Sequence, residues 1–344
     1  MRIALHYFKG AFVLTVIGLL IAFGLGWAYQ GGPGGALSFL FVAAVLAVLE
    51  ISLSFDNAIV NANKLKEMTP LWQHRFLTWG IVIAVFGMRL VFPLLVVVIA
   101  AGVGPVEALR LAATRPHEYA RIVGEAHLAI AAFGGSFLMM VALSYFVNDG
   151  KEVDWIASVE RRMRACASIK GLEIGVLLVV VMLFVWLLPA REENMFLFAA
   201  VCGLLTFLGV EVLGQLLDRA DLAEGMARGG VGAFLYLEVL DASFSFDGVI
   251  GAFAMTQNLF LIAIGLGIGA LYVRSMTLML VERQTLSEFR YLEHGAFWSI
   301  LILSGVMFLQ TLMPVPEWAT GLIGAGFIGL ALLSSLRFRR LHMA

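Results

Sequence analysis

The stretch Glu50-Ile-Ser-Leu-Ser-Phe-Asp-Asn57 places two acids and two serines inside an apolar run of membrane-spanning length. A second copy, Asp241-Ala-Ser-Phe-Ser-Phe-Asp-Gly248, repeats the acid, the serine and the Phe-Asp pair at the same spacing. A carboxylate at the centre of a bilayer costs about 2.5–3.5 kcal/mol on insertion scales, so it normally faces a cavity or an ion path. Two matching copies therefore point to a transport site inside a membrane.

The composition of the whole chain agrees with a membrane location. Its 344 residues are 61% hydrophobic and 14% charged, whereas soluble domains are about 45–50% apolar and about 25% charged. We predict an all-α fold, a polytopic membrane protein with about ten transmembrane helices in a single transmembrane domain (1–344). The lipid bilayer is the expected partner. The net charge of −1 gives no reason to expect nucleic acid.

Apolar runs of about 17–25 residues mark the membrane-spanning helices. The chain contains ten such runs, at about 11–30, 38–60, 76–100, 126–147, 172–189, 194–215, 231–255, 259–281, 297–313 and 318–336.

The distribution of basic residues predicts how these helices are oriented. The two termini and every second loop from 61–75 onward carry 17 of the 23 lysines and arginines, and the alternate loops carry 4. The remaining two, Arg89 and Arg274, lie within spans. Because basic loops stay on the cytoplasmic side, we predict a multi-pass protein of the inner (plasma) membrane with both termini in the cytoplasm.

The acidic stretches belong to a longer internal repeat. Asp56 aligns with Asp247 at an offset of 191 residues, and Arg89 aligns with Arg274 at an offset of 185. By the predicted topology the two copies are inverted, and transporters built in this way place their site near the midplane at the repeat interface. The predicted segments are repeat 1 at about 38–100, intervening helices at about 126–215, repeat 2 at about 231–281 and accessory C-terminal helices at about 297–336.

Helical spacing sorts the polar residues of each copy onto one stripe. The two stripes consist of Glu50, Ser54, Asn57 and Asn61 in the first copy, and of Glu238, Asp241, Ser245 and Gly248 in the second. Asp56 and Asp247 fall off these stripes if the helices are continuous. Either each aspartate faces a different neighbour, or the helices are unwound near Ser52–Ser54 and Ser243–Ser245. We expect a local break, because broken helices that line a cavity can coordinate ions.

The residue types indicate which ligand such a site would take. Carboxylates, hydroxyls and an amide, without a cysteine or paired histidines, suit a hard divalent cation as substrate. We predict Mn²⁺ above Ca²⁺ or Mg²⁺, and no organic cofactor. The candidate metal ligands are Glu50, Ser54, Asp56, Asn57, Glu238, Asp241, Ser245 and Asp247.

Arg89 and Arg274 are the candidate charge-pairing residues, which would hold the acids in place when the metal is absent. Asp56 or Asp247 is the expected partner of Arg89. If the acids only paired with these arginines, they would serve to hold helices together. However, the acids outnumber the arginines, and a cation could fill the deficit of positive charge.

The SFDN segment at 54–57, the SFDG segment at 245–248, and the acid six residues before each aspartate resemble the TerC-type integral membrane family and its close relatives of unassigned function. The resemblance extends over about residues 38–281. It implies an exporter of divalent metal, manganese above all. The site residues that it implies are Glu50, Asp56, Asn57, Asp241 and Asp247. Gly248 departs from the family pattern, in which an asparagine is expected.

Other functions are left open by the sequence. An exporter of an amino acid or another zwitterion would use the two arginines for the substrate carboxylate, and a structural or assembly role is a further alternative. We do not expect an enzyme, because the chain has no HExxH motif, no P-loop and no GxGxxG after a strand. Glu211, with Gln215 near the inner end of the sixth predicted span, has no assigned role, and the oligomeric state stays open.

The predicted topology can be tested with reporter fusions. A reporter that is active only in the periplasm should be active when fused after Gly104 and inactive when fused after Asp154. Fusions that report the same side at both positions would contradict the inverted repeat.

Overall fold

The computed structural model describes residues 2–148, 153–166, 168–169, 171–223, 230–283 and 289–342. Every regular element in this part of the chain is a helix. Seven of the described helices are long and apolar enough to cross a membrane, which confirms the prediction of an all-α polytopic membrane protein. They are α1 (Arg2–Gln30), α2 (Gly32–Leu53), α8 (His127–Phe146), α11 (Ala190–Ala223), α13 (Leu259–Glu282), α15 (Leu292–Gln310) and α16 (Glu317–His342).

The other three predicted spans also fall on helices. Two of them, α10 (Leu172–Leu187) and α12 (Val231–Met255), differ from the seven because α10 is only 16 residues long and α12 carries three acids. The third is made of three successive segments, α4 (Pro70–Val82), η1 (Ile83–Val91) and α5 (Phe92–Ala101). The number of ten spans and the inversion of the repeats stay predictions.

Contacts between Cα atoms divide the chain into two compact units. Unit 1 contains Met1–Ser54, Pro70–His127 and Phe244–Met279, and unit 2 contains Phe55–Thr69, Leu128–Ser243 and Leu280–Ala344. The division passes between Ser54 and Phe55 in the first acidic stretch and between Ser243 and Phe244 in the second. The single transmembrane domain expected from the sequence stays a prediction.

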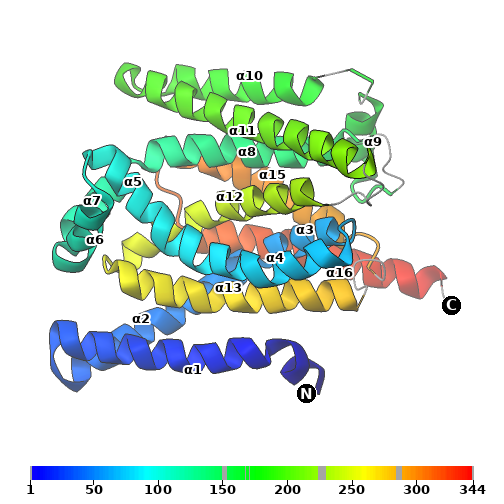
Figure 1. The fold of residues 1–344 in the computed structure, drawn as a ribbon. Coiled ribbons are helices and arrows are strands. Elements are labelled where there is room, and N and C mark those ends of the chain that lie inside the picture. The colour runs from blue at the N-terminus through cyan, green and yellow to red at the C-terminus, as the bar shows by residue number, and fades with distance from the viewer. Residues whose placement is uncertain are drawn as a thin grey trace. The chain divides into compact units, whose positions relative to one another are not determined.

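In unit 1, α1 and α2 form a helical hairpin, seen in dark blue in Figure 1. Ala22, Phe39 and Ala43 of this hairpin form a buried cluster with Leu261 of α13. The short helices α6 (Pro105–Thr114) and α7 (Pro116–Glu125) pack against α5 and against each other.

The helix that carries Arg89 is locally widened. Its middle segment, η1, is a π-helix, and the N–H of Phe92 donates to the carbonyl of Gly87, five residues back. Pro93 offers a reason in the sequence: it has no N–H, and in a regular α-helix its ring clashes with the carbonyl four residues before it, that of Arg89. π-Helical segments are rare and are often found at functional sites.

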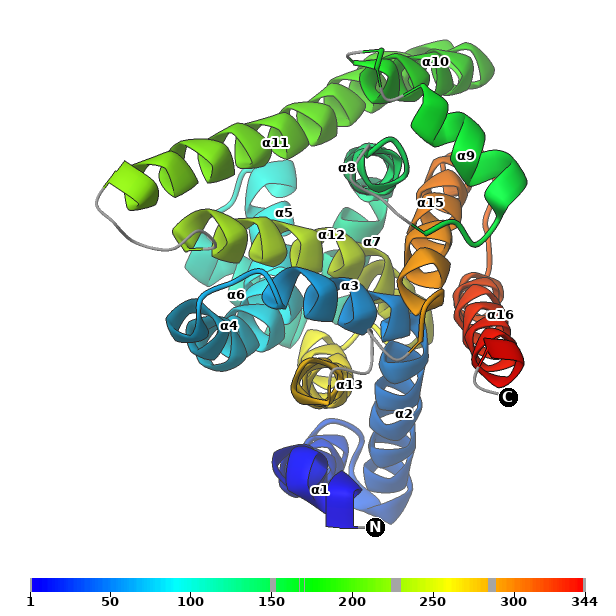
Figure 2. The same cartoon turned by 90° about the vertical axis from the view of Figure 1, so that its right-hand side faces the viewer.

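Unit 2 is organised around α15. This helix packs against α16 and against α3 (Phe55–Leu65), as Figure 2 shows. The two helices α10 and α11 of the same unit lie side by side. The long loop before α10 contains a further helix, α9 (Ala157–Ala165).

A buried carboxylate outside the predicted spans joins α9 to α15. Glu160 is 0% exposed and lies 2.8 Å from Nδ1 of His294. It also accepts a hydrogen bond from Nε1 of Trp298 at 2.9 Å. The backbone N–H groups of Trp155 and Ile156 donate to it as well, at 3.2 and 3.1 Å. One side chain thus serves as acceptor for groups from two segments of unit 2.

Replacing Glu160 by alanine should detach α9 from α15. A buried donor left without its acceptor costs about 1–3 kcal/mol, and several donors lose theirs here. We therefore expect a clearly lower thermal midpoint in detergent and faster tryptic cleavage between Arg161 and Arg164. Glu118→Ala is the control, because it removes an exposed ion pair with Arg115, and such changes are usually within about 0.5 kcal/mol. Equal midpoints and cleavage rates for the two variants would contradict the role of Glu160.

Candidate functional site

The first acidic stretch is broken at Ser54, as expected from the sequence. Helix α2 ends at Leu53, Ser54 has φ −101° and ψ 19°, and α3 begins at Phe55. The break places Asp56 in the first turn of α3, where the positive end of the helix dipole stabilises a carboxylate. Its Oδ1 also accepts a hydrogen bond from the backbone N–H of Asn57 at 2.8 Å.

A second set of contacts holds the other oxygen of Asp56. Asp56 is only 4% exposed, and its Oδ2 accepts a hydrogen bond from the hydroxyl of Ser299 in α15 at 2.8 Å. A Cβ at Gly324 of α16 would lie 2.9 Å from Oγ of Ser299, so a glycine there lets α16 pack closely behind this hydroxyl. Sequence reasoning missed Ser299 and Gly324, because nothing in the pattern links Asp56 to a serine 243 positions away.

The second acidic stretch is not broken. Helix α12 is continuous from Val231 to Met255, so the break expected near Ser243–Ser245 is wrong. Two polar side chains of this helix, Ser243 and Asp241, form hydrogen bonds without opening it. The hydroxyl of Ser243 donates to the carbonyl of Val239 at 3.0 Å, and Asp241 accepts a hydrogen bond from Nδ2 of Asn61 in α3 at 2.6 Å.

Helices α3 and α12 are antiparallel where they meet in unit 2. Asn61 bonds Asp241, whereas Lys64, three residues further along α3, lies over the ring of Tyr236, five residues earlier in α12. The predicted inversion of the repeats requires that these two helices run antiparallel. Glu238 is buried on the same helix, three residues before Asp241.

In unit 1, Glu50 is buried and forms an ion pair with Arg89 of η1. Its Oε1 also accepts a hydrogen bond from the hydroxyl of Ser54 at 3.1 Å. Glu50 is therefore a partner of Arg89, a role for which the sequence did not single it out. A Cβ at Gly248 would lie 3.1 Å from Oε2 of Glu50, so the glycine that departs from the TerC-type pattern leaves room for the paired carboxylate.

The structure describes the surroundings of only some of the remaining candidate residues in the second repeat. Arg274 is buried, with its guanidinium 4.2 Å from the centre of the Phe76 ring, and its pairing with an acid stays a prediction. Ser245 is also buried. The side chain of Asp247 lies outside the described residues.

The described acids do not form a ready-made metal cluster. Within the described ranges, no group of three or more His, Cys, Asp or Glu side chains could hold a metal ion. Three of the acids are instead each bonded to a side chain of another helix: Glu50 to Arg89, Asp56 to Ser299 and Asp241 to Asn61. A bound cation would have to share or displace these contacts.

The Glu50–Arg89 pair predicts a specific pattern of stability. Arg89→Met leaves a buried carboxylate without its cation, and breaking a buried pair from one side costs about 3–5 kcal/mol. Adding Glu50→Gln should recover most of the lost thermal midpoint, measured on the purified protein in detergent. Arg121→Met is the control, since its ion pair with Glu125 is exposed. Additive losses in the double variant would show that Arg89 stabilises another group.

Comparison with known sequences assigns the chain to a family. The family described as "Protein of unknown function (DUF475)" matches residues 55–342, from the first residue of α3 to the last of α16. No curated protein and no solved structure matches the chain, so the resemblance to the TerC-type family stays a prediction. Since the match covers most of the length of the chain, the chain belongs to the DUF475 family.

Proposed function

We propose that this protein is a membrane transporter that exports a divalent metal cation, Mn²⁺ before other hard cations, along helices α3 and α12. One observation carries the proposal. The buried residues described on these helices within unit 2 include three carboxylates, Asp56, Glu238 and Asp241, and no lysine or arginine. Acids in membrane-spanning helices are costly and mark ion pathways, so their accumulation here favours cation transport.

The other polar groups of α3 suit the same substrate. In the part of the chain that the structure describes, Oδ1 of Asn57 and Oδ1 of Asn61 are buried without a hydrogen-bond donor. Buried carbonyl oxygens normally have a partner, and a cation would satisfy both. Together with Asp56 and Asp241 they make an oxygen-rich lining, which hard divalent ions prefer.

The proposal does not require three converging carboxylates. An ion such as Mg²⁺ is often bound through one or two carboxylates while it keeps several waters. In the proposed path the ion is held by Asp56 or Asp241 with amide oxygens and its own waters. The resemblance to the TerC-type family is the reason for placing Mn²⁺ first, and the predicted cytoplasmic termini place the protein in the inner membrane.

Export of an amino acid is the second candidate. In that case a buried arginine would bind the substrate carboxylate. Arg89 is engaged by Glu50 in unit 1, so it would have to release this acid first. At Arg89, the ion pair with Glu50 therefore favours a metal substrate over a zwitterion.

Transport by the purified protein in liposomes tests the proposal. Asp56→Asn and Asp241→Asn keep the size of each side chain and remove its charge, so each should lower Mn²⁺ uptake at least about tenfold, the effect of losing about 1.4 kcal/mol of binding. Glu125→Gln is the control, because it removes an exposed acid that pairs with Arg121, and it should transport at the rate of the wild type.

Two outcomes would overturn the proposal. Unchanged uptake in both aspartate variants would remove α3 and α12 from the ion path. Liposomes that take up an amino acid but no Mn²⁺, Mg²⁺ or Ca²⁺ would establish the zwitterion alternative.

A further inference from the structure

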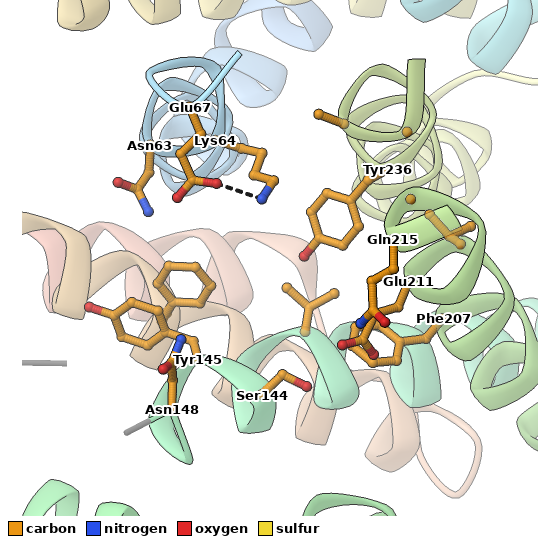
Figure 3. A pocket seen from close by; sticks show the side chains of 16 residues that line it. Asn63, Lys64, Glu67, Ser144, Tyr145, Asn148, Phe207, Glu211, Gln215 and Tyr236 are labelled. Carbon is orange, nitrogen blue, oxygen red and sulfur yellow. Dashed lines mark hydrogen bonds and ion pairs between the residues drawn. The ribbon is translucent and has the colours of Figure 1, made fainter. Parts of the chain in front are cut away.

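A cavity of about 380 Å³ lies in unit 2, beside the antiparallel pair of α3 and α12. Its walls come from α3, α8, α11, α12 and α15 and from residues just after α3 and α8. In Figure 3, Glu211 and Gln215 of α11 lie on the opposite side of the cavity from Asn63, and Tyr236 of α12 lies between them. The cavity thus contains Glu211, to which the sequence assigned no role.

The cavity continues the line of the buried acids. Asn63 and Lys64 on its α3 side follow Asn61 by two and three residues, and Tyr236 on its α12 side precedes Asp241 by five. The bond between Asn61 and Asp241 therefore lies about one turn further along the same two helices. An ion in the cavity would be next to the proposed path.

The charges of the lining favour a cation. Lys64, Glu67 and Glu211 are its charged members. Nζ of Lys64 lies 2.6 Å from Oε2 of Glu67, a contact that the dashed line in Figure 3 marks, so these two charges largely cancel. The carboxylate of Glu211 remains, and it gives the cavity a net negative charge.

The size of the cavity suits an ion that keeps its water. A water molecule takes about 30 Å³ in the liquid, so 380 Å³ corresponds to about a dozen waters. A divalent ion with an octahedral shell of about six waters fits in this space. The amides of Asn63 and Gln215 and the hydroxyl of Tyr236 are groups that can bond to such a water shell.

We infer that this cavity is a second cation site, a vestibule in which Glu211 holds a hydrated divalent ion before it reaches the acids of α3 and α12. Lys64 limits the affinity of this site, because it neutralises Glu67. The passage of the ion from the vestibule to the deeper acids rests on the proposed function. The binding of the ion in the cavity does not.

Mn²⁺ binding to the purified full-length protein tests the vestibule. The electron paramagnetic resonance signal of free Mn²⁺ gives the dissociation constant, both in the wild type and in the Asp56→Asn, Asp241→Asn background. Glu211→Gln should weaken binding about three- to tenfold, the scale of one charge acting through water-filled space. Lys64→Gln should strengthen it by a similar factor, because it releases the charge of Glu67. Glu193→Gln, on the same helix but outside the cavity, should leave the constant unchanged.

The opposite directions of the two substitutions make the test decisive. Equal constants for the wild type, Glu211→Gln and Lys64→Gln would overturn the vestibule, even if Asp56→Asn abolishes transport and the proposed function stands. Weaker binding of glycine, used as an amino-acid probe, in Lys64→Gln would also overturn it, since Lys64 would then bind a carboxylate. The expected changes in Mn²⁺ binding without any transport in liposomes would support the vestibule and refute the proposed function.

Discussion

A carboxylate inside a membrane protein needs a compensating group, because the low-dielectric interior cannot solvate its charge as water does. The described acids meet this requirement in different ways. Glu50 has a cation, the guanidinium of Arg89. Asp56 lies in the first turn of α3 and accepts hydrogen bonds from the Asn57 N–H and the Ser299 hydroxyl. These contacts join η1 to α2 in unit 1 and α3 to α15 in unit 2.

The kind of compensation has a functional consequence. In unit 1 the charge of Glu50 is cancelled by Arg89, so this pair attracts a cation only weakly. In unit 2, Asp56 and Asp241 are bonded to a hydroxyl and an amide, which stabilise the carboxylates without removing their charge. In the proposed path, Asp56 and Asp241 would therefore attract a cation more strongly than the Glu50–Arg89 pair does, and the carboxylate of Glu211 would add to this attraction in the cavity of the same unit.

The C-terminal helices are more than accessory elements. Ser299 of α15 donates its hydroxyl to Asp56, and His294 and Trp298, five residues and one residue earlier in α15, contact Glu160 of α9. Helix α16 packs behind Ser299 at Gly324. One helix, α15, thus contacts both Asp56 and Glu160 of α9.

The sequence by itself determined the fold class, since the length of an apolar run decides whether a helix can cross a bilayer. It also singled out Glu50, Asp56, Glu238 and Asp241, which the structure buries, and favoured the break near Ser54. Only the tertiary structure decided the partners of these acids, such as Asn61 for Asp241, 180 positions apart, and the continuity of α12. The physical reason is that periodicity shows which residues share a face of one helix. Which other helix meets that face depends on packing between segments distant in the chain, and the preferred partner of a buried charge is set there.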